Sequence, residues 1–281
     1  MAVFPSSAAS RAAWRVQGAW RRLQARRLPK MSVRELHLTS QVGYRIVGQL
    51  ATPEGAGPLP GLVISPAIHA GIRVMEGVNN PVNASEIAAL GFAVLTLDPA
   101  GRGESWGEED FGGLEHQDNV RIALEWMLKD GAVDGTVGVL SLSLGVAAAV
   151  GALAGSKLPV RWLVDWEGPS DREIITAGGT IMVPAAGHAL ADDSYWRPRE
   201  AVRTVHRLRC GYVRLQANPD HAQPSEVRHA ERMIRAASSG NLPFFQINDH
   251  PRNEVPTRAL WHAGGPFSAN TVILRKLRAL R

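Results

Sequence analysis

A serine stands at the centre of the most informative stretch of this chain, Ser141-Leu142-Ser143-Leu144-Gly145. The apolar run 137–140 precedes it and the small, apolar run 146–152 follows it, which predicts a buried strand, a tight turn and a helix. A turn of this kind strains the serine backbone, exposes its hydroxyl and requires small residues on either side. We therefore expect Ser143 to act as a nucleophile.

A nucleophilic serine needs an acidic residue and a histidine, because the histidine accepts its proton and the acid orients the histidine. We expect the chain order serine, acid, histidine, with each group at the carboxyl end of a strand. Asp220 fits the acid, since it follows the predicted strand 211–216 in a loop rich in turn residues. Asp165, which ends the preceding strand, is the alternative.

The histidine is harder to assign, because the chain contains nine of them. His250 follows the predicted strand 244–248 and completes the order Ser143, Asp220, His250. It is therefore our candidate for the base. The competing histidines are His221, His188 and His262.

Stabilising the charge that develops on the attacked oxygen requires two backbone N–H groups. The N–H of Leu144, directly after the nucleophile, is the first candidate. The loop 66–71 after another short apolar strand provides the second, which we place at Ile68, with Ala67 or His69 as alternatives. Candidate residues for a substrate pocket are His69, Trp166 and Trp196.

The elements that position these residues alternate along the chain after an initial hairpin. The predicted strands are 32–40, 44–51, 61–65, 92–98, 137–140, 160–165, 211–216 and 244–248. The predicted helices are 83–90, capped by Asn83 and Glu86, then 117–130, 144–153, 224–237 and one within 258–281. This order predicts an α/β fold with a mostly parallel sheet, an N-terminal antiparallel hairpin and helices on both faces. Residues 166–205 interrupt the alternation, and we interpret them as a lid.

The basic residues are concentrated at the N-terminus. Residues 1–34 hold eight of the 31 basic residues and no acidic one, which leaves 23 basic against 26 acidic residues in the remainder. The mildly acidic body argues against nucleic-acid binding. We interpret 1–30 as a basic extension. Either translation starts at Met31 and the extension is not made, or the extension is an organellar transit peptide, or it is a helix that contacts a membrane. The domain proper is expected at 31–281.

Other classes of site have little support in the sequence. Gly101-Arg102-Gly103 lacks the third glycine of a dinucleotide fingerprint, no P-loop is present, and we found no metal-ligand spacing. No cofactor or metal is therefore expected. The single cysteine, Cys210, is compatible with a reducing compartment and a cytoplasmic location, and it is expected to be buried. The oligomeric state is left open.

Residues from about 32 onward resemble the α/β-hydrolase superfamily, most closely its dienelactone hydrolase and prolyl-peptidase-like branch. The stretches that carry the resemblance are Ser65–Gly71, Asp98–Gly107, Ser141–Gly145 and Asn218–Pro224, while Glu167–Asp171 and the hairpin suggest the branch. One departure is Ser141, where the pattern has glycine. The resemblance implies a serine hydrolase that acts on a small acyl substrate through an acyl-enzyme. We expect carboxylic esters first, then peptides or amides, then thioesters; the alternative is a non-catalytic protein that keeps the fold and binds a ligand.

Overall fold

The computed structural model describes residues 28–76, 81–177, 188–218, 220–221, 228–257, 262–263 and 266–281, with only the backbone described at 262–263 and 266–268. Most of the predicted N-terminal extension, residues 1–27, therefore lies outside the described residues. No described helix is long and apolar enough to cross a lipid bilayer.

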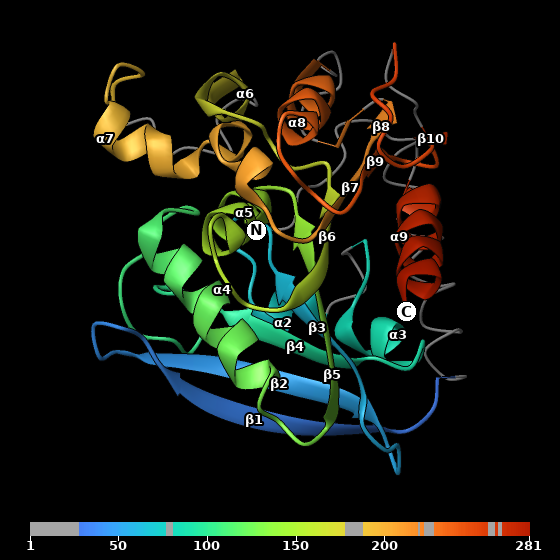
Figure 1. The fold of residues 1–281 in the computed structure, drawn as a ribbon. Helices are drawn as coiled ribbons and strands as arrows, with labels where there is room; N and C mark the ends of the chain where they lie inside the picture. The colour runs from blue at the N-terminus through green and yellow to red at the C-terminus, as the bar shows by residue number, and fades with distance from the viewer. Residues whose placement is uncertain are drawn as a thin grey trace, which may run out of the picture.

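An eight-stranded sheet organises the chain, in the order β1-β2-β4-β3-β5-β6-β7-β9 (Figure 1). The strands are β1 (Met31–Thr39), β2 (Arg45–Pro53), β3 (Leu59–Ser65), β4 (Ala93–Asp98), β5 (Val133–Leu142), β6 (Val160–Trp166), β7 (Gly211–Leu215) and β9 (Phe245–Ile247). β2 is antiparallel to both β1 and β4, and the remaining pairs are parallel. The predicted mostly parallel sheet with an N-terminal hairpin is confirmed.

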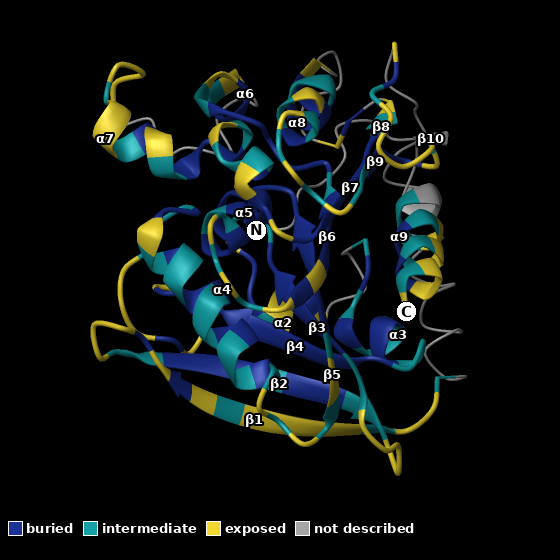
Figure 2. Cartoon of the chain, viewed as in Figure 1, coloured by how far each residue is buried: buried dark blue, intermediate teal, exposed yellow. Residues whose placement is uncertain are grey.

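Helices cover both faces of the sheet, as predicted (Figure 1). On one face lie α4 (Leu114–Met127), α5 (Gly145–Leu153) and α8 (Arg228–Ser238), and on the other α2 (Ile72–Met75), α3 (Ala84–Ala88) and α9 (Pro266–Leu280). Successive side chains of a strand point to opposite faces, so Leu62 and Ile64 pack with the second group and Val63 with the first. The central strands are consequently buried, whereas β1 is largely exposed (Figure 2).

The predicted cap of α3 is present. The Glu86 N–H donates to Asn83 Oδ1 at 2.8 Å, and the Asn83 N–H donates to Glu86 Oε2 at 3.0 Å. This reciprocal pair satisfies two donors that a helix N-terminus leaves free, so a short local signal was enough to locate the start of α3.

Residues 166–205 were predicted as a lid, and 178–187 of them lie outside the described residues. The described parts, 166–177 and 188–205, contain short helices after β6. They are α6 (Arg172–Ala177), α7 (Asp193–Trp196) and the 3-10 turns η2 (Arg197–Arg199) and η3 (Ala201–Arg203), followed by η4 (Val205–Arg207). Arg172 joins them, with its Nε 2.7 Å from Glu200 Oε1 and its Nη2 2.6 Å from Asp193 Oδ1. A two-residue parallel bridge between β8 (Ala217–Asn218) and β10 (His262–Ala263) lies outside the main sheet.

Candidate active site

Ser143 lies on the predicted strand–turn–helix, between β5 and α5. Its φ of 51° is in the left-handed region, a strained conformation for a residue with a side chain. The Ser143 N–H donates to the Trp166 carbonyl at 2.9 Å, which fixes the turn to the end of β6. A Cβ at Gly145 would lie 2.3 Å from the Ser65 carbonyl oxygen, so the turn also needs the glycine. The backbone thus has the geometry of a nucleophile turn.

The histidine beside Ser143 is His221. Its Nε2 lies 2.9 Å from Ser143 Oγ, and its Nδ1 lies 2.8 Å from Glu167 Oε2. A carboxylate only accepts hydrogen bonds, so Nδ1 carries the proton and Nε2 is left to accept one from Ser143. The three side chains therefore form a continuous proton path from the serine hydroxyl to a carboxylate.

Glu167 reaches this position because the chain turns sharply at the end of β6. Its φ of 48° is again left-handed, and the residue is buried. Three N–H groups donate to the carboxylate: the Ala217 N–H at 2.8 Å, the His221 N–H at 2.9 Å and the His221 Nδ1–H. This buried carboxylate is therefore fully hydrogen-bonded in its charged form.

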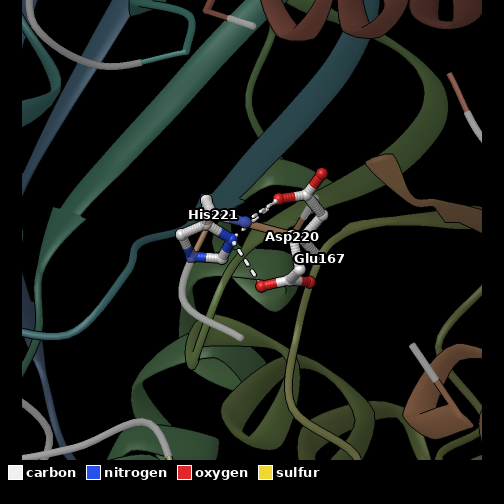
Figure 3. Close-up of side chains that lie close together, drawn as sticks. All are labelled: Glu167, Asp220 and His221. Atoms are coloured by element: carbon white, nitrogen blue, oxygen red, sulfur yellow. Dashed lines mark hydrogen bonds and ion pairs between the residues drawn. The ribbon is translucent and has the colours of Figure 1, made fainter. Parts of the chain in front are cut away.

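Asp220, the acid expected from the sequence, also faces the imidazole. Its Oδ1 lies 3.5 Å from His221 Nδ1, while its Oδ2 accepts from Gln216 Nε2 at 2.6 Å and lies 3.3 Å from His229 Nε2. Figure 3 shows both carboxylates close to the His221 ring. Asp220 is thus a second negative charge near the base, more distant than Glu167.

Asp165, the alternative acid, has a different partner. Its Oδ2 lies 2.7 Å from Arg214 Nη1 and 2.6 Å from the Tyr212 hydroxyl, and all three residues are buried. Arg214 also donates to the Gly168 carbonyl and to Gln216. The pair therefore holds the loop after β6 through the Gly168 carbonyl, and no hydrogen bond or ion pair joins either residue to His221 among the described residues.

The environment of His221 raises the pKa of its imidazole. Burial lowers this pKa, since it disfavours the charged ring, but the hydrogen bond and charge of Glu167 and the charge of Asp220 outweigh that effect. A quarter of the side chain remains exposed. The ring is thus suited to receive a proton from Ser143 and to hold it as an imidazolium.

His250 does not contact Ser143, so the structure does not support it as the base. The His250 Nδ1 lies 3.4 Å from the carbonyl oxygen of the next residue, Pro251, and 4.0 Å from Glu254 Oε2. The physical reason is that β7 and its loop already deliver a histidine to the serine. Of the other competitors, His188 pairs with Asp192 and stacks on Tyr195, and the side chain of His262 lies outside the described residues.

From the sequence, His221 was only a competitor for the base, and Glu167 was not a candidate for the acid. In chain order these contacts run Ser143, Glu167, His221, with the carboxylate and the histidine each one strand earlier than we placed them. A signal for Glu167 was present in the sequence: a carboxylate directly after a buried strand, followed by a glycine. A Cβ at Gly168 would lie 2.5 Å from Val146 Cγ1, so only glycine fits that close turn.

The two expected oxyanion donors belong to residues that line one small cavity. Ile68 and Leu144 both line it, together with Arg102 and His116, and its volume of about 10 Å³ suits one water-sized group. Within the described residues, neither the Leu144 nor the Ile68 backbone N–H donates a hydrogen bond. Both N–H groups stay candidate donors to an oxyanion. Arg102 holds the loop, since its Nη1 donates to the Ala67 and Ala70 carbonyls at 2.8 and 3.1 Å.

The three expected pocket residues lie in different surroundings. His69 is exposed, has a φ of 55° and contacts Phe111 edge-to-face at 6.0 Å. Trp166 stacks on the imidazole of His221. Trp196 is fully buried against Leu144 and donates its indole N–H to the Ala189 carbonyl at 3.0 Å, so it is a packing residue.

Glu167, Asp220 and His221 also approach a metal-binding arrangement, with one ligand atom from each within 4.8 Å of the others. His221 Nδ1 could ligate a cation there only after losing the proton that it donates to Glu167 Oε2. This hydrogen bond favours an acid paired with a base over a metal site at this position.

Strand order, elbow and Ser–His–carboxylate geometry define a protein of the α/β-hydrolase fold with a serine-hydrolase type of site. The family model described as X-Pro dipeptidyl-peptidase (S15 family) matches residues 43–264, and the chain belongs to this family. No curated protein matches the sequence significantly.

Solved structures share the fold at low sequence identity. The Pyrococcus horikoshii acylaminoacyl peptidase has a TM-score of 0.65 and 14% identity, over 92% of this chain and 42% of that protein. A puromycin-hydrolyzing peptidase of Mycobacterium tuberculosis has a TM-score of 0.63 and 16% identity, over 87% of this chain and 37% of that protein. An esterase of Pyrococcus furiosus has a TM-score of 0.59 and 14% identity, over 79% of this chain and 85% of that protein. The chain thus spans about two fifths of the length of these two peptidases and most of that of the esterase.

Proposed function

We propose that this protein is a serine hydrolase that cleaves peptide or related amide bonds through an acyl-enzyme. The observation that carries the proposal is the chain of contacts from Ser143 Oγ to His221 Nε2 and from His221 Nδ1 to Glu167 Oε2. In this proposal Ser143 is the nucleophile, His221 the general base and Glu167 the orienting acid. Asp220 is a second carboxylate that adds negative charge beside the imidazole.

In the first half-reaction Ser143 Oγ attacks the acyl carbonyl while His221 Nε2 takes the hydroxyl proton. The imidazolium is held by Glu167, and the Leu144 and Ile68 N–H groups stabilise the tetrahedral oxyanion. His221 then gives its proton to the leaving amine, and an acyl-Ser143 ester remains. In the second half-reaction His221 deprotonates a water molecule that releases the acid.

Peptide bonds are preferred over esters because the family is described by an X-Pro dipeptidyl-peptidase activity. An amine is a poorer leaving group than an alkoxide with an electron-withdrawing substituent, so its departure depends on the proton that His221 donates. Esters are the second candidate, because the same acyl-enzyme forms from them with less help from protonated His221 as the general acid.

The experiment compares X-Pro p-nitroanilides, single aminoacyl p-nitroanilides and short p-nitrophenyl esters, using wild type and Ser143→Ala. Release of p-nitroaniline that disappears in Ser143→Ala supports the peptidase proposal. Turnover of the esters alone assigns the site to ester hydrolysis. A folded protein that cleaves neither class and does not react with a fluorophosphonate favours the non-catalytic alternative.

A further inference from the structure

Trp166 contacts the proposed base and the proposed nucleophile at once. Its indole lies over the His221 imidazole, with ring centroids 4.5 Å apart and the planes inclined by 29°. Its carbonyl accepts the Ser143 N–H at 2.9 Å. One residue at the end of β6 therefore joins the two groups that exchange the proton.

The imidazole is consequently fixed in three directions. Glu167 holds Nδ1 in the ring plane, Ser143 lies at Nε2 in the same plane, and Trp166 covers one face. Two in-plane hydrogen bonds leave the ring free to rock about the line that joins its nitrogens. A stacked indole opposes that motion, since any tilt reduces the contact between the two faces.

An indole face also prefers a cation to a neutral ring, because the π-system carries negative charge on its face. The stacking is thus stronger when His221 is an imidazolium, the form that exists after it has taken the serine proton. We propose that Trp166 is a positioning residue of the active site, which orients His221 by stacking and stabilises its protonated form. This inference rests on the proposed function of His221.

Other charged and titratable groups act on the same ring and must be separated from Trp166 in any test. They are Glu167 after β6, Asp220 and Arg214 from β7 and its loop, and His229 of α8 through Asp220. Among the aromatic residues that the structure describes, only Trp166 stacks on the ring, so removing the indole leaves the hydrogen-bonding partners of the ring nitrogens in place.

The test uses Trp166→Phe and Trp166→Leu, with Trp162→Phe as a matched control. Trp162 lies four residues earlier on β6 and packs edge-to-face on Phe92 at 6.4 Å, away from His221. We expect Trp166→Leu to slow fluorophosphonate labelling of Ser143 about tenfold and to move its acid limb to lower pH, while Trp166→Phe restores most of the rate. The control, Trp162→Phe, should keep the wild-type rate of labelling and the wild-type position of the acid limb in its pH dependence. A Trp166→Leu protein that melts like wild type and labels at the wild-type rate and pH overturns the proposal.

A second measurement does not depend on catalysis. A protonated imidazole quenches an adjacent indole, so the tryptophan fluorescence of Ser143→Ala should fall as His221 takes up a proton. We expect this step to be absent when His221→Gln or Trp166→Phe is added to Ser143→Ala. A step that survives both changes refutes the stacking contact. Presence of the step in a protein that cleaves no substrate would retain the Trp166 contact and reject only the proposed function.

Discussion

Exchanging Glu167 for glutamine tests which carboxylate orients His221, and the structure sets the size of the effect. Three N–H groups donate to Glu167, two of them to Oε2 and one to Oε1. A glutamine amide has one oxygen and one NH2, so in either orientation its NH2 faces a donor. Leaving one buried donor unsatisfied costs about 1–3 kcal/mol, and the charge that raises the pKa of His221 disappears.

Glu167 raises the pKa of His221 through its hydrogen bond and its charge, so losing this carboxylate lowers that pKa. The acid limb of the pH dependence of kcat/KM should therefore move to lower pH. We also expect kcat to fall about 10²- to 10⁴-fold, because the imidazole loses the acceptor that fixes its tautomer. The assay is the pH dependence of fluorophosphonate labelling and of p-nitroanilide or ester hydrolysis.

Asp220→Asn is the matched variant, since Asp220 Oδ1 lies 3.5 Å from Nδ1, beyond the 2.8 Å of Glu167 Oε2. Asp220→Asn removes a negative charge near His221 but keeps the hydrogen bond between His221 Nδ1 and Glu167 Oε2. We expect a shift of the limb in the same direction but smaller, and a loss of activity of about tenfold or less. Finding that Asp220→Asn is the more damaging change, in proteins with equal melting temperatures, would refute the assignment of Glu167.

Three further predictions concern Arg102, the charge of His221 and the buried Cys210. Arg102→Met removes the donor to the Ala67 and Ala70 carbonyls. In steady-state kinetics kcat should therefore fall about 10- to 100-fold with little change in KM. A rise in KM as large as the fall in kcat would contradict this prediction. The raised pKa of His221 means that its charge stabilises the fold fully below about pH 6.5 and that this stability is lost as pH rises through the folded pKa. The melting-temperature difference between wild type and His221→Gln should therefore shrink from pH 6 to pH 9, and a constant difference would contradict the sign. Burial raises the pKa of Cys210 to about 12, so a thiol reagent at pH 8 should label it only after unfolding, which mass spectrometry detects.

Much of the fold could be predicted from the sequence because its signals are local. The alternation of strands and helices, the Asn83 cap and the small residues around Ser143 each depend on a few neighbouring residues. Burial of Cys210 was predicted in the same way and is confirmed.

The base could not be predicted with the same security, because it depends on which of two loops reaches Ser143. His250 and His221 both follow predicted strands, and a sequence pattern does not give the distance from a strand end to the serine. Glu167 depends on a left-handed turn directly after β6, with no motif beyond the following glycine. These are tertiary features, and only the structure places them together.

The measurement that tests the central assignment most directly is fluorophosphonate labelling of His221→Gln and His250→Gln beside wild type and Ser143→Ala. We predict labelling of wild type and His250→Gln at similar rates, a loss of about 10²- to 10⁴-fold in His221→Gln, and none in Ser143→Ala. Full labelling of folded His221→Gln with loss in His250→Gln would contradict the account and return the role of base to His250.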